Sequence, residues 1–207
     1  MCDQDRDSAQ GRETAQGREV AEQTNAVRPR LVLVTGGARS GKSAFAERVV
    51  RASGLERLYV ATGEARDGEM AERIARHRAE RGEDWRTLEV PIALAGLIAA
   101  EAGPGRIVLV DCLTLWLTNV MLADRPVEAE IEGLVAALAG AAGPVVLVSN
   151  EVGLGIVPDT PLGRRFRDAQ GRLNRRVAEI ATDAFFVAAG CPLRLKPAAD
   201  PVAALWS

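Results

Sequence analysis

The chain has 207 residues, of which 47% are apolar and 4% aromatic, and its formal net charge is −2. This apolar content is enough for a sizeable core, so it excludes a fully disordered chain. The near-neutral charge and the few aromatic residues argue against a protein that binds nucleic acid through a basic, stacking surface.

The first 28 residues differ from the rest of the chain. They contain no aromatic residue, and a six-residue unit occurs twice, at residues 8–13 and 14–19. Such a segment cannot bury enough apolar surface to order itself, so residues 1–28 are predicted to be a disordered extension, or a start codon assigned too early. Residues 29–207 are then expected to form one nucleotide-binding catalytic domain. The polar start predicts no signal peptide, and three cysteines without metal-type spacing are typical of a cytoplasmic protein.

From residue 31 onward, short continuous apolar runs alternate with helical patterns. The runs predict strands at residues 31–34, 58–61, 107–110, 145–148 and 184–188, with an edge strand at 193–195. Helices are predicted at residues 43–52, 69–80, 113–122 and 128–139, and along an apolar stripe from Phe166 to Ile180. Continuous apolar strands that alternate with helices indicate a mainly parallel sheet covered on both faces, whose ligands bind at the carboxyl ends of the strands.

A glycine-rich segment follows the first predicted strand and precedes the first predicted helix. Residues 36–43 read GGARSGKS and match the phosphate-loop pattern G-x-x-x-x-G-K-[ST]. Glycines let successive backbone N–H groups face one concavity, and the helix adds its positive N-terminal end. Lys42 is one of only two lysines among 26 basic residues. It occupies a position that needs a compact positive charge beside the phosphates, which the bulky, planar guanidinium of arginine would not provide. The predicted phosphate-binding residues are Gly36, Gly37, Ala38, Arg39, Ser40, Gly41, Lys42 and Ser43.

Two oxygen ligands for Mg²⁺ are predicted beside this loop. The Ser43 hydroxyl occupies the position that holds the metal in such loops, while Lys42 reaches the β- and γ-phosphates. Asp111 ends the apolar run at residues 107–110, where a carboxylate is the expected second partner of Mg²⁺. The alternative for Asp111 is an ordinary capping residue for the helix that follows.

His77 is the only histidine in the chain, and four arginines lie within four residues of it. Neighbouring cations favour the neutral imidazole, which is the form that attacks phosphorus. The alternative is an exposed histidine on a solvated helix face, and spacing alone favours that alternative.

Taken together, the motifs resemble those of the bifunctional adenosylcobinamide kinase/adenosylcobinamide-phosphate guanylyltransferase family of cobalamin biosynthesis. The resemblance runs from about residue 30 to residue 196, and its most specific parts are residues 77–89 and 150–158. It is also carried by residues 35–47, 59–62, 69–74, 111–114 and 163–174. It implies an α/β fold, a P-loop NTPase (RecA-like) three-layer sandwich with a mainly parallel, mixed β-sheet.

The resemblance implies two reactions. ATP or GTP phosphorylates adenosylcobinamide, and GMP from GTP is then transferred to that phosphate through a covalent intermediate on a histidine, which here matches His77. It also implies a small-molecule substrate and a homo-oligomer, a trimer. Mg²⁺ is expected as the cofactor of the phosphate loop. The near-neutral charge predicts no nucleic-acid partner, and the glycines and proline that interrupt the uncharged residues 133–150 predict no membrane insertion. By position in the family pattern, the nucleotide site should include Ala61, Thr62, Gly63, Arg78, Ala79, Glu80, Arg81, Glu89 and Asp111.

Two other functions compete with this one. A different P-loop small-molecule kinase without guanylyltransferase activity would form no covalent nucleotide, and a RecA-like module that binds nucleic acid would need a basic, aromatic surface. For two sequence features, the sequence leaves two interpretations each. Glu151 is either an acid/base group or part of a turn, and the six arginines of residues 163–176 either contact phosphate or a neighbouring subunit, or form a solvated helix face.

Overall fold

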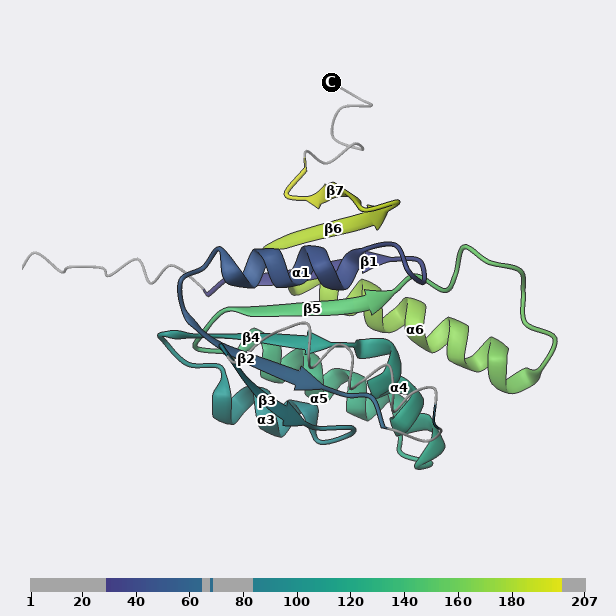
Figure 1. Ribbon diagram of the computed structural model, residues 1–207. Helices are drawn as coiled ribbons and strands as arrows, with labels where there is room; N and C mark the ends of the chain where they lie inside the picture. Colours follow the sequence, from purple (N-terminus) through teal and green to yellow (C-terminus); the bar gives the residue numbers. More distant parts are fainter. Residues whose placement is uncertain (1–28, 65–67, 69–83, 199–207) are drawn as a thin grey trace, which may run out of the picture.

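Seven strands form one mixed sheet in the order β3-β2-β4-β5-β1-β6-β7 (Figure 1). The computed structural model describes residues 29–64, 68 and 84–198. The strands are β1 (Leu31–Gly36), β2 (Glu56–Ala61), β3 (Trp85–Glu89), β4 (Arg106–Asp111), β5 (Val145–Asn150), β6 (Asp183–Ala188) and β7 (Cys191–Lys196). The helices are α1 (Lys42–Arg51), α3 (Leu94–Glu101), α4 (Leu113–Leu122), α5 (Val127–Ala139) and α6 (Pro161–Ile180). All strand pairs are parallel except β6 with β7.

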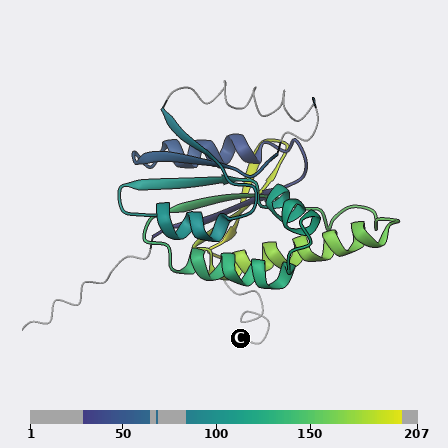
Figure 2. The ribbon, with the colours of Figure 1, turned by 90° about the horizontal axis from the view of Figure 1, so that it is seen from below.

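Helices cover both faces of the sheet, so the fold has three layers (Figure 2). Side chains alternate along a strand, and each face of the sheet therefore has its own core. On one face, Val32 and Val34 of β1 pack with Ala46 and Val50 of α1. On the other face, Leu31 and Leu33 belong to a core shared with α3, α4, α5 and α6. The expected three-layer α/β sandwich with a mainly parallel sheet is confirmed.

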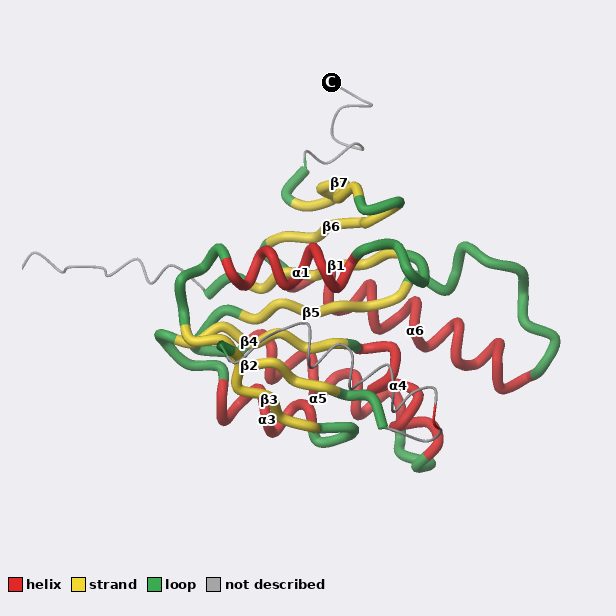
Figure 3. Tube along the Cα trace, in the orientation of Figure 1, coloured by secondary structure: helices red, strands yellow, loops and turns green. Residues whose placement is uncertain are grey.

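The same alternation assigns the last residues of four strands to one face. Ile107 and Leu109 of β4 and Val146 and Val148 of β5 pack in the α1 core, so Asp111 and Asn150 project from that face as well. Ala61 and Glu89 share it for the same reason, because Tyr59 and Trp85 belong to the α1 core. These four strands and β1, which leads into the loop before α1, all end at the carboxyl edge of the sheet, and their ends can be followed in Figure 3.

Most predicted elements are confirmed, with ends that differ by no more than two residues except for α6, which begins five residues before the predicted stripe. The structure adds two that the sequence patterns did not predict, strand β3 at one edge of the sheet and helix α3 after it. The predicted edge strand at 193–195 is confirmed as β7. The helix predicted at residues 69–80 and the extension predicted at residues 1–28 lie outside the described residues. No helix of the described residues is long and apolar enough to cross a membrane.

Candidate active site

The loop between β1 and α1 can be formed only with glycine at two of its positions. Gly36 has φ 153° and Gly41 has φ 93°. A Cβ on Gly36 would lie 2.4 Å from the carbonyl oxygen of Val187 and 2.7 Å from Ser40 Oγ. The backbone N–H of Gly190 donates to the carbonyl oxygen of Ser40 at 2.8 Å, so the β6–β7 turn holds the loop in place. The glycines of the motif are therefore required by close approach of the backbone.

The polar groups of this loop are arranged to receive an anion. Lys42 Nζ donates to the carbonyl oxygen of Gly37 at 3.2 Å, which holds the ammonium over the loop. Ser40 Oγ is buried and has no hydrogen-bond partner in the described part of the chain. A buried hydroxyl left unpaired by the protein is the kind of group that a ligand satisfies. These residues therefore fit a bound phosphate chain.

Ser43 and Asp111 supply the oxygen atoms that Mg²⁺ prefers. Ser43 lies in the first turn of α1, and Asp111 ends β4 on the same face of the sheet. Among residues 29–64, 68 and 84–198, no three histidine, cysteine, aspartate or glutamate side chains gather into a metal site. A Mg²⁺ ion at this edge would thus take most of its ligands from phosphate and water, as nucleotide-bound Mg²⁺ usually does. The donor set fits that role.

The segment after β2 lies beside Asp111. Ala61 pairs with both Asp111 and Glu89 in the sheet register, which places the exposed Glu89 at the same edge. The Thr62 side chain is fully buried, and its hydroxyl donates to the carbonyl oxygen of Cys112 at 2.7 Å and accepts from the Cys112 N–H at 2.9 Å. The Thr62 hydroxyl therefore fixes the chain after β4. That Thr62 lines the nucleotide site stays a prediction of the family pattern.

The remaining predicted residues, His77, Arg78, Ala79, Glu80 and Arg81, lie outside the described residues.

The arginine cluster of α6 is largely neutralised by acidic residues. Arg172 pairs with Glu128 at 2.7 Å, and Arg176 pairs with Glu132 and Glu179 at 2.7 and 2.6 Å. The Arg176 guanidinium holds the pKa of the Glu132 carboxyl below its usual value by a hydrogen bond. These contacts join α6 to α5, which favours the structural interpretation for this part of the cluster.

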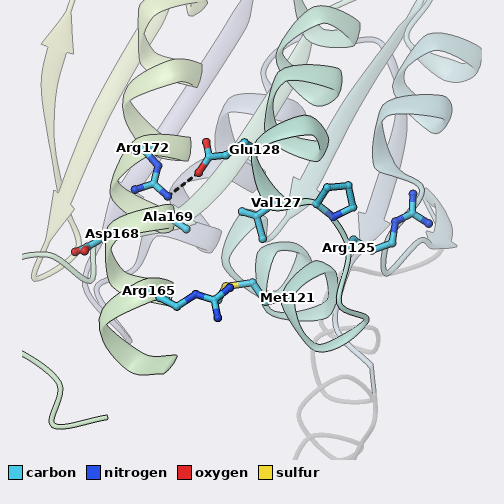
Figure 4. A pocket seen from close by; sticks show the side chains of 9 residues that line it. Met121, Arg125, Val127, Glu128, Arg165, Asp168, Ala169 and Arg172 are labelled. Atoms are coloured by element: carbon cyan, nitrogen blue, oxygen red, sulfur yellow. Dashed lines mark hydrogen bonds and ion pairs between the residues drawn. The ribbon is translucent and has the colours of Figure 1, made fainter. Parts of the chain in front are cut away.

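A pocket of about 450 Å³ lies where the end of α4, the start of α5 and α6 meet (Figure 4). Met121, Val127 and Ala169 line it together with Arg165, and the Arg172–Glu128 pair forms its rim. It is on the opposite face of the sheet from α1, so it is separate from the phosphate loop.

Glu151 has a structural contact. Its Oε1 accepts a hydrogen bond from the Gly153 N–H at 2.7 Å, and its own N–H donates to the carbonyl oxygen of Gly36 at 3.0 Å. These bonds favour the turn role over the acid/base role.

A buried polar network behind β5 was missed by the sequence interpretation. Gln170 is fully buried and donates to Ser149 Oγ and Asn174 Oδ1, both at 2.9 Å. Asn174 Nδ2 donates to the carbonyl oxygen of Asn150 at 3.0 Å, so α6 holds the end of β5 in place. The signal was two amides four residues apart within the apolar stripe of α6, where they share one helix face.

Cys112, which follows Asp111, is buried, and burial raises the pKa of its thiol from 9.0 to about 11, with the charge of Asp111 adding to the effect. We predict that iodoacetamide at pH 8 modifies the exposed Cys191 in the folded protein but reaches Cys112 only after unfolding, as peptide mass spectrometry would show. Modification of Cys112 in the folded state at pH 8 would contradict this assignment.

The same pKa shift makes stability depend on pH. The thiol of Cys112 ionises at a lower pH in the unfolded chain than in the folded protein, so its contribution to stability is present below pH 9 and lost as the pH rises to about 11.

The sequence is similar to one family of known proteins over most of its length. A model of the family described as cobinamide kinase / cobinamide phosphate guanyltransferase matches residues 32–195. The bifunctional adenosylcobalamin biosynthesis protein CobP of Pseudomonas aeruginosa is 52% identical over 166 residues, which are 79% of this chain and 96% of the relative. The bifunctional adenosylcobalamin biosynthesis protein CobU of Escherichia coli K12 is 41% identical over 181 residues, 80% of this chain and 99% of the relative.

Solved structures with a similar arrangement share little sequence. The flagellar accessory protein FlaH from Methanocaldococcus jannaschii is 12% identical with a TM-score of 0.44, covering 77% of this chain and 72% of that chain. The RadB recombinase is 16% identical with a TM-score of 0.41, covering 76% of this chain and 73% of that chain.

Proposed function

The chain belongs to the cobinamide kinase / cobinamide phosphate guanyltransferase family, and from this premise we propose that one nucleotide site at the phosphate loop serves both of its reactions. The protein is a transferase of adenosylcobalamin biosynthesis that acts on a small corrinoid substrate. In the first reaction, ATP or GTP gives its γ-phosphoryl group to a hydroxyl of adenosylcobinamide. In the second, GTP gives GMP to the new phosphate, and adenosylcobinamide-GDP is formed.

For the kinase reaction, the loop residues bind and orient the triphosphate. The backbone N–H groups of residues 36–43 and the Lys42 ammonium neutralise the charge that shifts toward the β-phosphate as the γ-phosphoryl group leaves. Ser43 and Asp111 would hold Mg²⁺, which would neutralise negative charge on the phosphate chain. We assign to Glu89, which pairs with Ala61 at the end of β3, the role of accepting a hydrogen bond from the nucleoside.

For the guanylyltransferase reaction, we assign the nucleophile to His77. Neutral imidazole attacks the α-phosphorus of GTP, so that a P–N bond forms while the bond to the leaving pyrophosphate breaks. The phosphate of adenosylcobinamide phosphate then attacks the same phosphorus, the P–N bond breaks and the histidine is regenerated. A covalent intermediate divides one difficult transfer into two easier steps. Arg78, Ala79, Glu80 and Arg81 belong to this part of the proposal.

The observation that carries the proposal is the phosphate loop, which holds Lys42 and the unpaired, buried Ser40 hydroxyl and follows β1 at the same carboxyl edge of the sheet where β4 ends in Asp111. The test is to incubate the protein with adenosylcobinamide, GTP and Mg²⁺ and to follow the products by mass spectrometry. We expect the phosphate to appear first and the GDP derivative to follow. A reaction that stops at the phosphate in the presence of excess GTP would identify a simple kinase instead.

The metal assignment has its own test. Replacing Asp111 with asparagine keeps the size of the side chain but removes the charge, so we expect kcat/KM of the kinase reaction to fall about 100-fold and the Mg²⁺ concentration for half-maximal rate to rise. Glu151→Gln removes one charge from the same edge of the sheet and serves as the control. An unchanged Mg²⁺ requirement in the Asp111 variant would remove this residue from the metal site.

We also propose that the enzyme is a homo-oligomer, a trimer, and that it works in the cytoplasm, where nucleoside triphosphates are supplied and thiols remain reduced. Support for self-association comes from large apolar side chains that are exposed on the loop before α6, with Leu154 80% and Ile156 96% accessible. Apolar groups this exposed are typical of a surface that a partner covers. Sedimentation equilibrium of the intact protein should give three times the chain mass, and a monomer would contradict the assignment.

A further inference from the structure

Asn150 is the last residue of β5, and β5 lies between the strand that leads into the phosphate loop and the strand that ends in Asp111. We propose that the side-chain amide of Asn150 donates a hydrogen bond to the γ-phosphoryl group of the bound nucleotide and is a catalytic residue of the kinase reaction. The inference rests on the proposed function, because it requires a triphosphate in the loop.

The sheet register places Asn150 beside the loop. Asn150 pairs with Gly36, the first residue of the phosphate loop, in the parallel β1–β5 ladder. Its side chain projects from the α1 face, as do those of Val146 and Val148 two and four residues earlier. Asp111 projects from the same face of the next strand, with Val148 as its register partner. Asn150 therefore lies on the α1 face, on the strand between the phosphate loop and the predicted metal ligand.

The backbone of Asn150 is fixed by hydrogen bonds from both sides. Its N–H donates to Thr114 Oγ1 at 2.8 Å, and its carbonyl oxygen accepts from Asn174 Nδ2 at 3.0 Å. The buried network of Ser149, Gln170 and Asn174 reaches only this backbone, because it lies on the α6 face of the sheet. The position of Asn150 is thus held rigidly while its side chain is left out of the network.

The amide itself is unpaired. Asn150 Oδ1 is buried, and neither it nor Nδ2 forms a hydrogen bond within the described part of the chain. The buried Oδ1 accepts hydrogen bonds only, so a phosphoryl group, which is itself an acceptor, would bond the Nδ2 end of this amide. The unpaired hydroxyl of Ser40, in the loop that Gly36 opens, is a second group of this kind at the same edge. The Nδ2 group offers two N–H donors and no charge, which suits a phosphoryl group whose oxygens carry the developing charge.

This role predicts an unequal effect on the two reactions. The γ-phosphoryl group is the reacting group of the kinase step, whereas in the guanylyltransferase step it departs within pyrophosphate. We expect Asn150→Ala to lower kcat of the kinase reaction about 100-fold, a typical loss for one donor to the transition state. Covalent labelling by GTP should change far less. Asn150→Asp, which keeps the shape and replaces the donor by a negative acceptor, should be at least as damaging.

The control is Asn174→Ala, which removes the hydrogen bond to the Asn150 backbone but leaves the Asn150 amide in place. A second measurement does not depend on the corrinoid substrate: calorimetric titration with a non-hydrolysable ATP analogue and with ADP. The wild-type protein should prefer the triphosphate, and Asn150→Ala should lose that preference while Asn174→Ala retains it. An unchanged preference for the triphosphate in Asn150→Ala would overturn the inference. So would equal losses of both reactions in Asn150→Ala, if Asn174→Ala shows the same losses and both variants have a lowered melting temperature. Absence of any kinase reaction in the wild-type protein would instead overturn the proposed function.

Discussion

Replacing Lys42 with alanine is expected to lower kcat of both reactions by about 10²–10³-fold. The Lys42 ammonium is held over the loop by the carbonyl oxygen of Gly37, so its charge is already in place when a triphosphate binds. It acts on the β- and γ-phosphates, which carry the developing negative charge in both reactions because both leaving groups are phosphates. Coupled assays of ADP or GDP release and of pyrophosphate release would measure the two rates separately.

The chain offers a matched control for this variant. Lys196, the only other lysine, donates to the carbonyl oxygens of Ala178 and Glu179 near the end of α6. We expect Lys196→Ala to lower the melting temperature slightly and to leave both rates close to those of the wild-type protein. Lys42→Arg keeps the charge but brings a larger, planar group, and it should not restore activity. Full kinase turnover in Lys42→Ala would show that the loop does not bind the reacting phosphates.

The elements that sequence patterns predict well are those whose signal is local. The runs Leu31–Val34 and Val145–Val148 are continuous and apolar, because β1 and β5 lie in the middle of the sheet and are covered on both faces. Strand β3 lies at an edge and mixes Trp85 with Arg86 and Glu89, so it lacks such a run. Helix α3 has the sequence LAGLIAAE, which is apolar or small on nearly all sides and shows no helical period.

In the candidate site too, the residues with a local sequence signal could be predicted, and those whose role depends on distant neighbours could not. Residues 36–43 are contiguous, and their spacing alone predicts a phosphate loop. The structural role of Thr62 and the unpaired amide of Asn150 depend on neighbours distant in sequence, such as Cys112 for Thr62 and Gly36 for Asn150. Only the register of the parallel strands brings such residues together, and single-sequence patterns do not specify that register.

Replacing His77 with alanine is expected to lower guanylyl transfer by at least about 10⁴-fold, the scale of loss when an enzyme loses its nucleophile. Kinase turnover should remain within a few-fold of the wild-type rate, because the imidazole takes no part in γ-phosphoryl transfer. This separation is the reverse of that expected for the Asn150 variants. His77 is the only histidine, so no second imidazole in the chain can replace it.

Covalent labelling by GTP measures directly whether His77 carries GMP. The protein is incubated with Mg²⁺ and GTP labelled with ³²P at the α-position, denatured and counted, with GTP labelled at the γ-position as the control. We predict a label from the α-position only, labile to acid and stable to base, and absent from His77→Ala. Label that persists in His77→Ala, or that comes from the γ-position, would contradict it.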